Sequence, residues 1–316
     1  MRFGIIGFGK IARKFVNSIT YSNGNEVVAI ASRSVSDDDP YLLAHPNVKV
    51  YKDYEKMLAS DEIDAVYVAI PHKYHYEWIV KALEAKKAVL SEKPAVLESK
   101  QMKHIKEVAI RNNVAFLEAL KTKMNESFIS LCNEIDMIGK IESIEANFCF
   151  DANPIRDSGT YLFEKDQGGA LNDVGSYLLG FAMKLINEKV IDVTSESKVV
   201  NDIDEHFVAH LRFENGAVAH LEGAIDQNKN RYALIKGEKG SIMVPMFNRM
   251  IDYTITLNNG EVIERNYPIL GDDMTYQINV LQECAINNTI ESSLHTLDEM
   301  IEIVEVTEKI RDSFKK

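Results

Sequence analysis

The sequence of 316 residues predicts an α/β fold in two domains. Residues 1–122 are expected to form a doubly wound parallel sheet, because short apolar runs alternate there with helical patterns. Residues 123–316 are expected to form an α+β domain with a mostly antiparallel, open sheet, because their strand-like segments alternate with period two. The length also suits two domains of roughly 100–200 residues each.

Six short runs rich in valine and isoleucine predict the strands of the first domain. They are continuous rather than alternating, as expected where both faces of a sheet are buried. A helical pattern over residues 74–85 separates two of them, with Trp78 and Leu83 on one side and Lys81 and Glu84 on the other. Repeated strand–helix–strand units of this size imply a parallel sheet with right-handed crossovers. The six runs are residues 2–6, 26–31, 48–51, 65–70, 88–90 and 114–117.

In the second domain, residues 207–213 alternate strictly between apolar and polar side chains, which is typical of a half-buried strand. Asn215-Gly216 and Asn259-Gly260 separate strand-like runs and predict hairpins with type I′ turns. A further strand is predicted over residues 141–150. Helical patterns are expected over residues 126–136, near 169–185, and twice close to the C-terminus. The last two carry the apolar stripes Met274, Ile278, Leu281 and Ala285, and Leu297, Ile301 and Val304.

Composition excludes several classes of function. The 36 basic residues against 48 acidic ones give a formal net charge of −12, which disfavours binding to nucleic acid. No apolar run approaches the roughly 18 residues that cross a membrane, and the N-terminus enters a strand without a cleavable signal. Cys132, Cys149 and Cys284 form no disulfide framework, and neither they nor the histidines form a metal motif. We therefore expect a cytoplasmic protein with no bound metal.

The first strand leads directly into a glycine turn, Gly7-Phe8-Gly9-Lys10-Ile11-Ala12, which fits the pattern G-x-G-x-x-(G/A). Its position between a strand and a helix is the context in which this pattern binds the pyrophosphate of a dinucleotide. Gly7 allows the tight turn, Gly9 allows the backbone to approach the phosphates, and Ala12 allows close packing of helix and sheet. The helix N-terminus supplies amide groups and positive potential. The alternative is a glycine turn that binds nothing.

The end of the second predicted strand indicates which dinucleotide binds. Sites for NAD usually place Asp or Glu there, whereas this chain has Ala31-Ser32-Arg33-Ser34. The Arg33 guanidinium suits a 2′-phosphate, to which the Ser32 hydroxyl is able to donate a hydrogen bond. The hypothesis is that NADP is preferred over NAD. The alternative is that Arg33 is a solvated loop residue.

Two further motifs complete a family pattern. Ser91-Glu92-Lys93-Pro94 follows the fifth predicted strand, and residues 168–177 (GGALNDVGSY) open a later helix. Together with the glycine turn they resemble the glucose–fructose oxidoreductase/inositol dehydrogenase (Gfo/Idh/MocA) family over nearly the whole chain. Tyr177 stands where most members have His, which resembles the branch of dimeric dihydrodiol dehydrogenase and glucose–fructose oxidoreductase, where a tyrosine serves. Further similarities are Pro71 and His75, Glu118-Ala119, and residues 237–242.

The resemblance implies a Rossmann-type domain that binds NADP or NAD, and it implies roles for particular residues. Lys93 would lie beside the nicotinamide, Asp173 would orient a substrate hydroxyl or Lys93, and Tyr177 would exchange the proton. Ile70, Pro71, His75 and Glu92 would join the glycine turn in holding the cofactor. For His75, a purely structural histidine with satisfied hydrogen bonds is an equal alternative.

These roles are chemically consistent. Hydride transfer to a carbonyl leaves an alkoxide that must be protonated, and the reverse reaction needs a base. A phenol with a pKa near 10 is a poor base, but a neighbouring ammonium such as that of Lys93 lowers its pKa. Asp173 and Tyr177 are four residues apart, so they share one face of the helix.

The expected function is therefore NAD(P)-dependent hydride transfer to or from a carbinol or carbonyl carbon of a sugar, cyclitol or diol. Lys121 and Lys123 suggest a polar or anionic substrate, and Arg156 is a further candidate for substrate contact. The alternatives are an NADP-binding sensor without turnover and an NAD-dependent glycosidase of the same fold. By resemblance, we expect a homodimer or homotetramer formed through the C-terminal sheet.

Overall fold

The computed structural model describes residues 1–269 and 271–314, which divide into two compact units. The N-terminal unit comprises residues 1–121 and 271–300, and the C-terminal unit comprises residues 122–269 and those from 301 onwards. The second domain was expected to include all of residues 123–316, whereas residues 271–300 group with the first unit. The N-terminal unit is thus built from two separate stretches of chain.

A six-stranded parallel sheet forms the centre of the N-terminal unit, as the sequence predicts. Its strands are β1 (Arg2–Ile6), β2 (Glu26–Ala31), β3 (Lys49–Tyr51), β4 (Ala65–Val68), β5 (Ala88–Ser91) and β6 (Phe116–Glu118). They lie in the order β3-β2-β1-β4-β5-β6. Every residue of β4 is buried, which explains the continuous apolar run. That strand ends at Val68, so Ile70 lies in the following loop rather than in the predicted strand.

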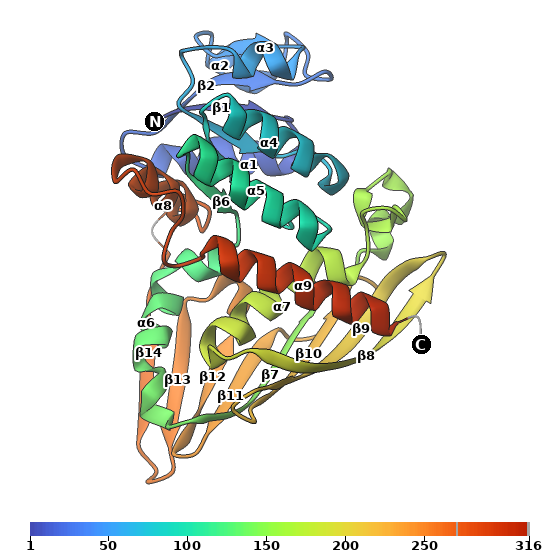
Figure 1. The fold of residues 1–316 in the computed structure, drawn as a ribbon, viewed down its shortest axis with the longest axis vertical. Coiled ribbons are helices and arrows are strands. Elements are labelled where there is room, and N and C mark those ends of the chain that lie inside the picture. Colours follow the sequence, from blue (N-terminus) through green and yellow to red (C-terminus); the bar gives the residue numbers. More distant parts are fainter. Residues whose placement is uncertain (270, 315–316) are drawn as a thin grey trace. The chain divides into compact units, whose positions relative to one another are not determined.

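Helices connect the strands of this sheet (Figure 1). The ring of Phe15 stacks on that of Tyr67 with centroids 4.0 Å apart, which fixes the first helix on β4. The helix of residues 75–84 packs against β4 and β5, and the helix of residues 99–112 packs beside it. The helices are α1 (Lys10–Ser18), α2 (Pro40–Ala44), α3 (Tyr54–Leu58), α4 (His75–Glu84) and α5 (Ser99–Asn112).

Helix α8 (Thr275–Ile286) explains why residues 271–300 belong to this unit. The Thr275 hydroxyl donates to the carbonyl oxygen of Ser18 at 3.1 Å, at the end of α1. The backbone N–H of Phe116 in β6 donates to the carbonyl oxygen of Ile290 at 3.0 Å. Of the predicted apolar stripe, Met274, Ile278 and Leu281 are buried and Ala285 is half-buried.

The C-terminal unit contains an eight-stranded, mostly antiparallel sheet, which also confirms the predicted fold class. Its strands are β7 (Ile141–Cys149), β8 (Val190–Val200), β9 (Ile203–Phe213), β10 (Val218–Ala224), β11 (Tyr232–Gly237), β12 (Gly240–Pro245), β13 (Asp252–Leu257) and β14 (Val262–Asn266). They lie in the order β14-β13-β12-β11-β7-β10-β9-β8, and only β7 and β10 pair in parallel.

Helices pack on one face of this sheet. They are α6 (Glu126–Glu134), α7 (Ala170–Ile186) and the part of α9 (Leu297–Ser313) after residue 300. Helix α7 packs against β7, β9 and β10, and the Ser195 hydroxyl of β8 donates to the carbonyl oxygen of Ile310 at 3.1 Å. On the opposite face, Thr194, His210 and His220 are exposed. This difference between the two faces accounts for the period-two pattern.

The two predicted hairpins are present, but their turns are not of type I′. A type I′ turn needs positive φ at both central residues. Gly216 and Gly260 each have a φ of +91°, whereas Asn215 and Asn259 are not among the residues with positive φ. Gly216 N donates to the carbonyl oxygen of Phe213 at 2.9 Å, and Gly260 N donates to that of Leu257 at 2.9 Å. Each loop is therefore a three-residue turn that ends on a glycine with positive φ.

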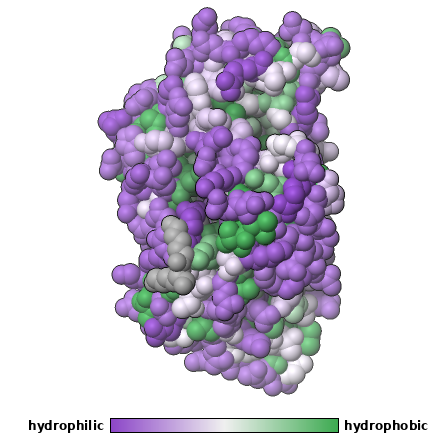
Figure 2. Space-filling model, turned by 90° about the vertical axis from the view of Figure 1, so that its right-hand side faces the viewer, coloured by the Kyte–Doolittle hydropathy of each residue, from purple (hydrophilic) through white to green (hydrophobic). Residues whose placement is uncertain are grey.

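Hydrophilic side chains dominate the face of the molecule drawn in Figure 2, with hydrophobic residues in smaller patches. This agrees with the 27% charged residues of the sequence. None of the helices formed by residues 1–269 and 271–314 has the length and apolar character that a membrane span needs.

Candidate active site

The glycine turn between β1 and α1 combines a crowded position with an open one. Gly7 has a φ of +88°, and a Cβ there would lie 2.6 Å from the carbonyl oxygen of Ala69. A Cβ on Gly9, the N-cap of α1, would meet nothing within 4 Å. Gly7 is therefore required by the fold, whereas Gly9 leaves free the space that a pyrophosphate would use at the helix N-terminus.

The other residues of this turn divide between the core and the surface. Phe8 and Ala12 are buried, and the Phe8 ring packs between the ring of Tyr41 and the guanidinium of Arg13. Lys10 and Ile11 are exposed beside Gly9. The turn thus presents its backbone at Gly9 and the exposed side chains of Lys10 and Ile11 to a ligand, and it fits a dinucleotide.

The loop after β2 carries Arg33 to a cavity. The Ser32 hydroxyl oxygen is buried and accepts a hydrogen bond from the backbone N–H of Val35 at 3.2 Å, so this side chain shapes the loop. Lys52 donates from Nζ to the carbonyl oxygen of Val35 at 2.5 Å and holds the same loop. Arg33 lines a cavity of about 600 Å³ whose other walls include Lys52, Tyr54, Ile70, Pro71, Tyr74 and Trp78. Its two cations and three aromatic rings suit a phosphorylated adenosine.

His75, at the start of α4, links the loops that follow β4 and β5. Its Nε2 lies 2.6 Å from the carbonyl oxygen of Ile70, and its Nδ1 lies 2.9 Å from that of Pro94. The ring is completely buried, and burial lowers its pKa. Both nitrogens face backbone carbonyl groups, as expected for a histidine with a structural role. His75 holds two loops of the predicted cofactor site in place.

The loop that carries Lys93 is fixed on both sides of that residue. The Glu92 carboxylate accepts a hydrogen bond from the Tyr67 hydroxyl, and burial raises the pKa of Glu92. The Lys93–Pro94 peptide bond is cis. The backbone N–H of Ala95 then donates to Oε1 of Glu118 at 2.8 Å.

Glu118 is itself positioned by His295, which sequence reasoning did not single out. Glu118 is 4% exposed, and its Oε2 lies 3.1 Å from Nε2 of the buried His295. His295 lies in the returning segment 271–300, so no local sequence signal near Lys93 announces it. Glu118-Ala119 is one of the similarities to the family. The contacts of the Glu118 carboxylate with Ala95 and His295 give a physical reason for a glutamate at this position.

Helix α7 begins at a second glycine pair, Gly168-Gly169. Gly169 has a φ of +99°, and a Cβ there would lie 2.0 Å from Oδ1 of Asp204. The other oxygen of that carboxylate accepts a hydrogen bond from the backbone N–H of Leu171 at 2.7 Å. Burial raises the pKa of Asp204 to about 6. Asp204, from β9, therefore caps α7, a role that its position in the sequence does not reveal.

Asp173 and Tyr177 lie one turn apart on α7, as predicted. The Tyr161 hydroxyl donates to Oδ1 of Asp173 at 3.2 Å. Tyr177 is 9% exposed, and its ring centroid lies 5.5 Å from that of Phe148 in β7. The structure therefore brings an acid and a phenol together on the C-terminal unit, while Lys93 belongs to the N-terminal unit.

Lys121, one of the residues suggested for substrate contact, pairs with a carboxylate. Lys121 forms an ion pair with Asp273, which also accepts from Lys14 at 2.7 Å. Burial alone would raise the pKa of Asp273, but Lys121 and Lys14 outweigh it and hold that pKa far below its usual range. Lys123, the second cation of this segment, is 2% exposed. The prediction that Lys121 contacts substrate stays a prediction.

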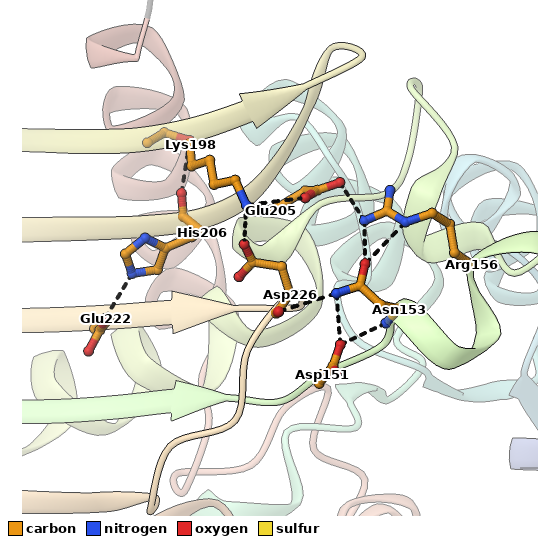
Figure 3. A network of polar contacts seen from close by, with 9 residues as sticks. Asp151, Asn153, Arg156, Lys198, Glu205, His206, Glu222 and Asp226 are labelled. Carbon is orange, nitrogen blue, oxygen red and sulfur yellow. Dashed lines mark hydrogen bonds and ion pairs between the residues drawn. The ribbon is translucent and has the colours of Figure 1, made fainter.

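Arg156 lies in a polar network that fixes the loop after β7 (Figure 3). Its guanidinium lies 2.7 Å from Oε1 of the buried Glu205 and donates to Oδ1 of Asn153 at 2.7 Å. Lys198 pairs with Asp226 at 2.7 Å in the same network. Arg156 therefore connects the loop to the strand ends of the sheet, and its predicted contact with substrate stays a prediction.

Comparison with protein families gives two matches that together span most of the chain. Residues 1–119 match a family described as "Oxidoreductase family, NAD-binding Rossmann fold". Residues 135–243 match the "GFO/IDH/MocA C-terminal domain". The two matched ranges fall on the parallel and antiparallel sheets respectively.

Curated proteins similar over nearly their full length include two dehydrogenases. Trans-1,2-dihydrobenzene-1,2-diol dehydrogenase of Danio rerio is 26% identical, with 93% of this chain and 90% of that protein covered. The scyllo-inositol 2-dehydrogenase (NADP(+)) IolU of Bacillus subtilis (strain 168) is 26% identical, with coverages of 98% and 96%.

Among solved structures, the aldose-aldose oxidoreductase of Caulobacter crescentus aligns with a TM-score of 0.89 at 18% identity, covering 100% of this chain and 97% of that one. A levoglucosan dehydrogenase in complex with NADH and L-sorbose aligns with a TM-score of 0.87 at 18% identity, covering 100% of this chain and 96% of that one. At these identities the likeness concerns the fold.

Proposed function

This chain belongs to the GFO/IDH/MocA oxidoreductase family, and on that premise we propose that it is an NAD(P)-dependent dehydrogenase or reductase. Hydride would pass between the nicotinamide and a carbinol or carbonyl carbon of a sugar, cyclitol or diol. The observation that carries the proposal is the open space above Gly9 at the N-terminus of α1. The full-length relatives named above act on a diol and an inositol, which supports this substrate class.

NADP is the cofactor that we propose for this chain in preference to NAD. Arg33 and Lys52 line a cavity together with Ile70 and Pro71 and supply two positive charges there. A 2′-phosphate would find in Arg33 a planar donor that suits its oxygens. Asp53 and Glu77 also line the cavity, but Asp53 accepts from the backbone N–H of Glu55 at 2.9 Å and so caps α3.

Side chains of the protein would then carry out the proton transfer that accompanies hydride transfer. The bound nicotinamide would supply or accept the hydride. Tyr177 would exchange the proton with the substrate oxygen, and the ammonium of Lys93 would lower the phenol pKa towards the working range. Asp173 would orient a substrate hydroxyl or Lys93, with Tyr161 donating to its carboxylate.

The test compares cofactor binding and turnover in the purified protein and in Tyr177→Phe. We expect NADPH binding to be retained in the variant and turnover of a polyol panel to fall about 10²–10⁴-fold, as for loss of a general acid–base. Tyr232→Phe is the matched control, because Tyr232 lies on β11 and its hydroxyl bonds to Glu145. Full turnover in Tyr177→Phe, or binding of neither dinucleotide, would contradict the proposal.

The same experiment separates the two other functions considered for this fold. A cofactor-binding sensor would bind NADPH and turn over no member of the panel. A glycosidase that uses the dinucleotide transiently would release a sugar without net change in nicotinamide absorbance. Net, substrate-dependent oxidation or reduction of the cofactor distinguishes the proposed dehydrogenase from both.

Location and assembly are also proposals. We propose a cytoplasmic location, supported by Cys149 and Cys284, which are buried free thiols as is usual in reducing compartments. We further propose a homodimer or homotetramer formed through the open face of the C-terminal sheet, where Thr194, His210 and His220 are exposed. Light scattering on the purified protein, with Thr194→Arg as the interface variant, tests the assembly.

A further inference from the structure

Arg231 immediately precedes β11 and lies against the aromatic residues that pack on Tyr177. Its guanidinium carbon is 4.1 Å from the centroid of the Phe148 ring. The Phe148 ring in turn packs on Tyr177, with 5.5 Å between centroids. Stacking on an aromatic ring fixes the plane of a guanidinium and leaves the N–H groups along its edge available to a ligand. Arg231 and the predicted proton-transfer residue therefore share one aromatic platform.

The pairing of Arg231 differs from that of other arginines in the C-terminal unit. Arg265 donates to both oxygens of Glu134, at distances of 2.7–3.1 Å. Arg156 lies 2.7 Å from Glu205. Within the described residues of this unit, the guanidinium of Arg231 takes part in no hydrogen bond or ion pair. A guanidinium normally has carboxylate or carbonyl partners when it leaves bulk water.

The acidic side chains that flank this segment are already committed to other cations. Glu222 accepts from Lys229 at 2.6 Å and contacts His206 at 2.8 Å. Asp226 pairs with Lys198 at 2.7 Å. Lys229 and Asp226 lie on the same loop as Arg231, between β10 and β11. Among residues 1–269 and 271–314, these neighbouring charges have charged partners, whereas the guanidinium of Arg231 has none.

The electrostatic surroundings of Arg231 favour an incoming anion. Arg231 is half-buried, and burial is the main cause that lowers its pKa. The charge of Arg249 lowers that pKa further, while Cys149, Asp173 and Tyr177 raise it. A half-buried cation beside a second cation is costly, and a bound anion would offset that cost.

We propose that Arg231 binds an anionic oxygen group, a carboxylate or a phosphate, on the substrate whose reacting carbon faces Tyr177. A guanidinium presents two parallel N–H donors that match the oxygens of either group. The inference rests on the proposed dehydrogenase function and narrows its substrate class to acidic polyols, namely sugar acids or sugar phosphates. It also assigns recognition of the negative charge to Arg231 rather than to Lys121, which pairs with Asp273.

Matched substrate trios test this inference in the full-length protein with NADP and NADPH. For glucose, galactose and mannose, the neutral aldose is compared with its uronic acid and its 6-phosphate. We expect at least one acidic member to exceed its neutral counterpart in kcat/KM, and Arg231→Met to raise the KM of that member about 10–100-fold. The KM of the neutral member should change less than threefold. Which acidic member responds distinguishes carboxylate from phosphate recognition.

Lys229→Met is the matched control, because Lys229 lies two residues away and pairs with Glu222. It should leave the preference for acidic members unchanged. Arg231→Lys retains the charge without the planar fork and should recover only part of the affinity. A preference for neutral members, or an unchanged acidic preference in Arg231→Met, would overturn the inference.

Direct binding keeps a failure of this inference separate from a failure of the proposed function. If no member of the trios is turned over although NADPH binds, the proposed dehydrogenase function fails for these substrates. Calorimetry with glucuronate and with glucose 6-phosphate, in the presence of NADPH, then decides on Arg231. Binding that is lost in Arg231→Met and kept in Lys229→Met supports the anion site, and absence of binding to both compounds overturns it.

Discussion

Helices α1 and α7 both begin next to a glycine, but the space above their N-termini differs. Beside α1, a Cβ on Gly9 would meet nothing within 4 Å. Beside α7, a Cβ on Gly169 would lie 2.0 Å from Asp204, whose carboxylate already accepts from the helix backbone. The N-terminal amides of α1 are left for an external anion, whereas at the N-terminus of α7 the Asp204 carboxylate of the same chain accepts from the backbone. A glycine before a helix therefore indicates that another group comes close to the backbone there. The neighbouring residues decide whether that group is a ligand or a side chain of the protein itself.

The largest expected effect follows from filling the crowded site. Gly169→Ala introduces a Cβ at a φ of +99° and against the Asp204 carboxylate, so we expect a loss of about 3 kcal/mol or more in the free energy of unfolding. Urea denaturation measures it. Gly216→Ala is the control, because Gly216 has a similar φ of +91° with nothing within 4 Å of its Cβ. Equal losses in the two variants would mean that Asp204 does not crowd Gly169.

The second prediction concerns the pH dependence that Asp204 gives to stability. Burial raises its folded-state pKa to about 6, above the ordinary value of 3.8 that applies to the unfolded chain. The folded protein therefore holds a proton more tightly, and the stabilisation from protonation is full below about pH 4 and lost as the pH rises through 6. Between these limits, the difference in unfolding free energy between wild type and Asp204→Asn should change by up to about 3 kcal/mol. A constant difference from pH 4 to pH 7 would contradict this assignment.

The third prediction concerns the open site. Gly9→Ala should leave the free energy of unfolding within about 1 kcal/mol of wild type, because its Cβ collides with nothing in the protein. The same methyl group would occupy the space proposed for the pyrophosphate, so NADPH binding should weaken by about tenfold or more. Fluorescence titration of NADPH measures this, with Gly216→Ala as a control that keeps full affinity. Unchanged NADPH affinity in Gly9→Ala would place the phosphates elsewhere.

The smallest expected effect concerns the cavity that Arg33 lines. Arg33→Ala should reduce the ratio of NADP to NAD affinity by about tenfold, the contribution of one charge-assisted hydrogen bond to phosphate. Arg212→Ala is the control, because Arg212 forms an ion pair with Asp192 in the other unit at 3.6 Å. Calorimetry with both dinucleotides measures the ratio, and the same ratio in both variants would show that Arg33 does not read the 2′-phosphate.

The fold was predictable because its determinants are local and periodic. The six parallel strands follow from short apolar runs, and the hairpins follow from Asn-Gly pairs. The turn type was predicted wrongly. Each hairpin loop closes over three residues, and within it the glycine (Gly216 or Gly260) has positive φ while the preceding asparagine does not. The predicted helix over residues 126–136 ends at Glu134 and continues as a 3-10 turn.

The candidate site was predictable only where family motifs cover it. Asp173 and Tyr177 share a helix face that their spacing already defines. Asp204 contacts Leu171, which lies 33 positions away in the sequence. His295 contacts Glu118 across 177 positions, and Arg231 contacts Phe148 across 83 positions. Sequence periodicity carries no signal for such pairs, because they depend on which strand lies next to which.

The return of residues 271–300 to the first sheet has a consequence for the order in which the protein is made. During synthesis the ribosome delivers β6 long before α8, so the edge of the sheet that receives α8 must wait through about 150 residues of the other unit. The domain proposed to hold the dinucleotide is thus the first to begin, and it is completed only after most of the other unit has been made. A gene fragment ending at residue 121 would yield an apolar flank around Phe116 without its cover, and a nascent chain paused there would be a substrate for chaperones.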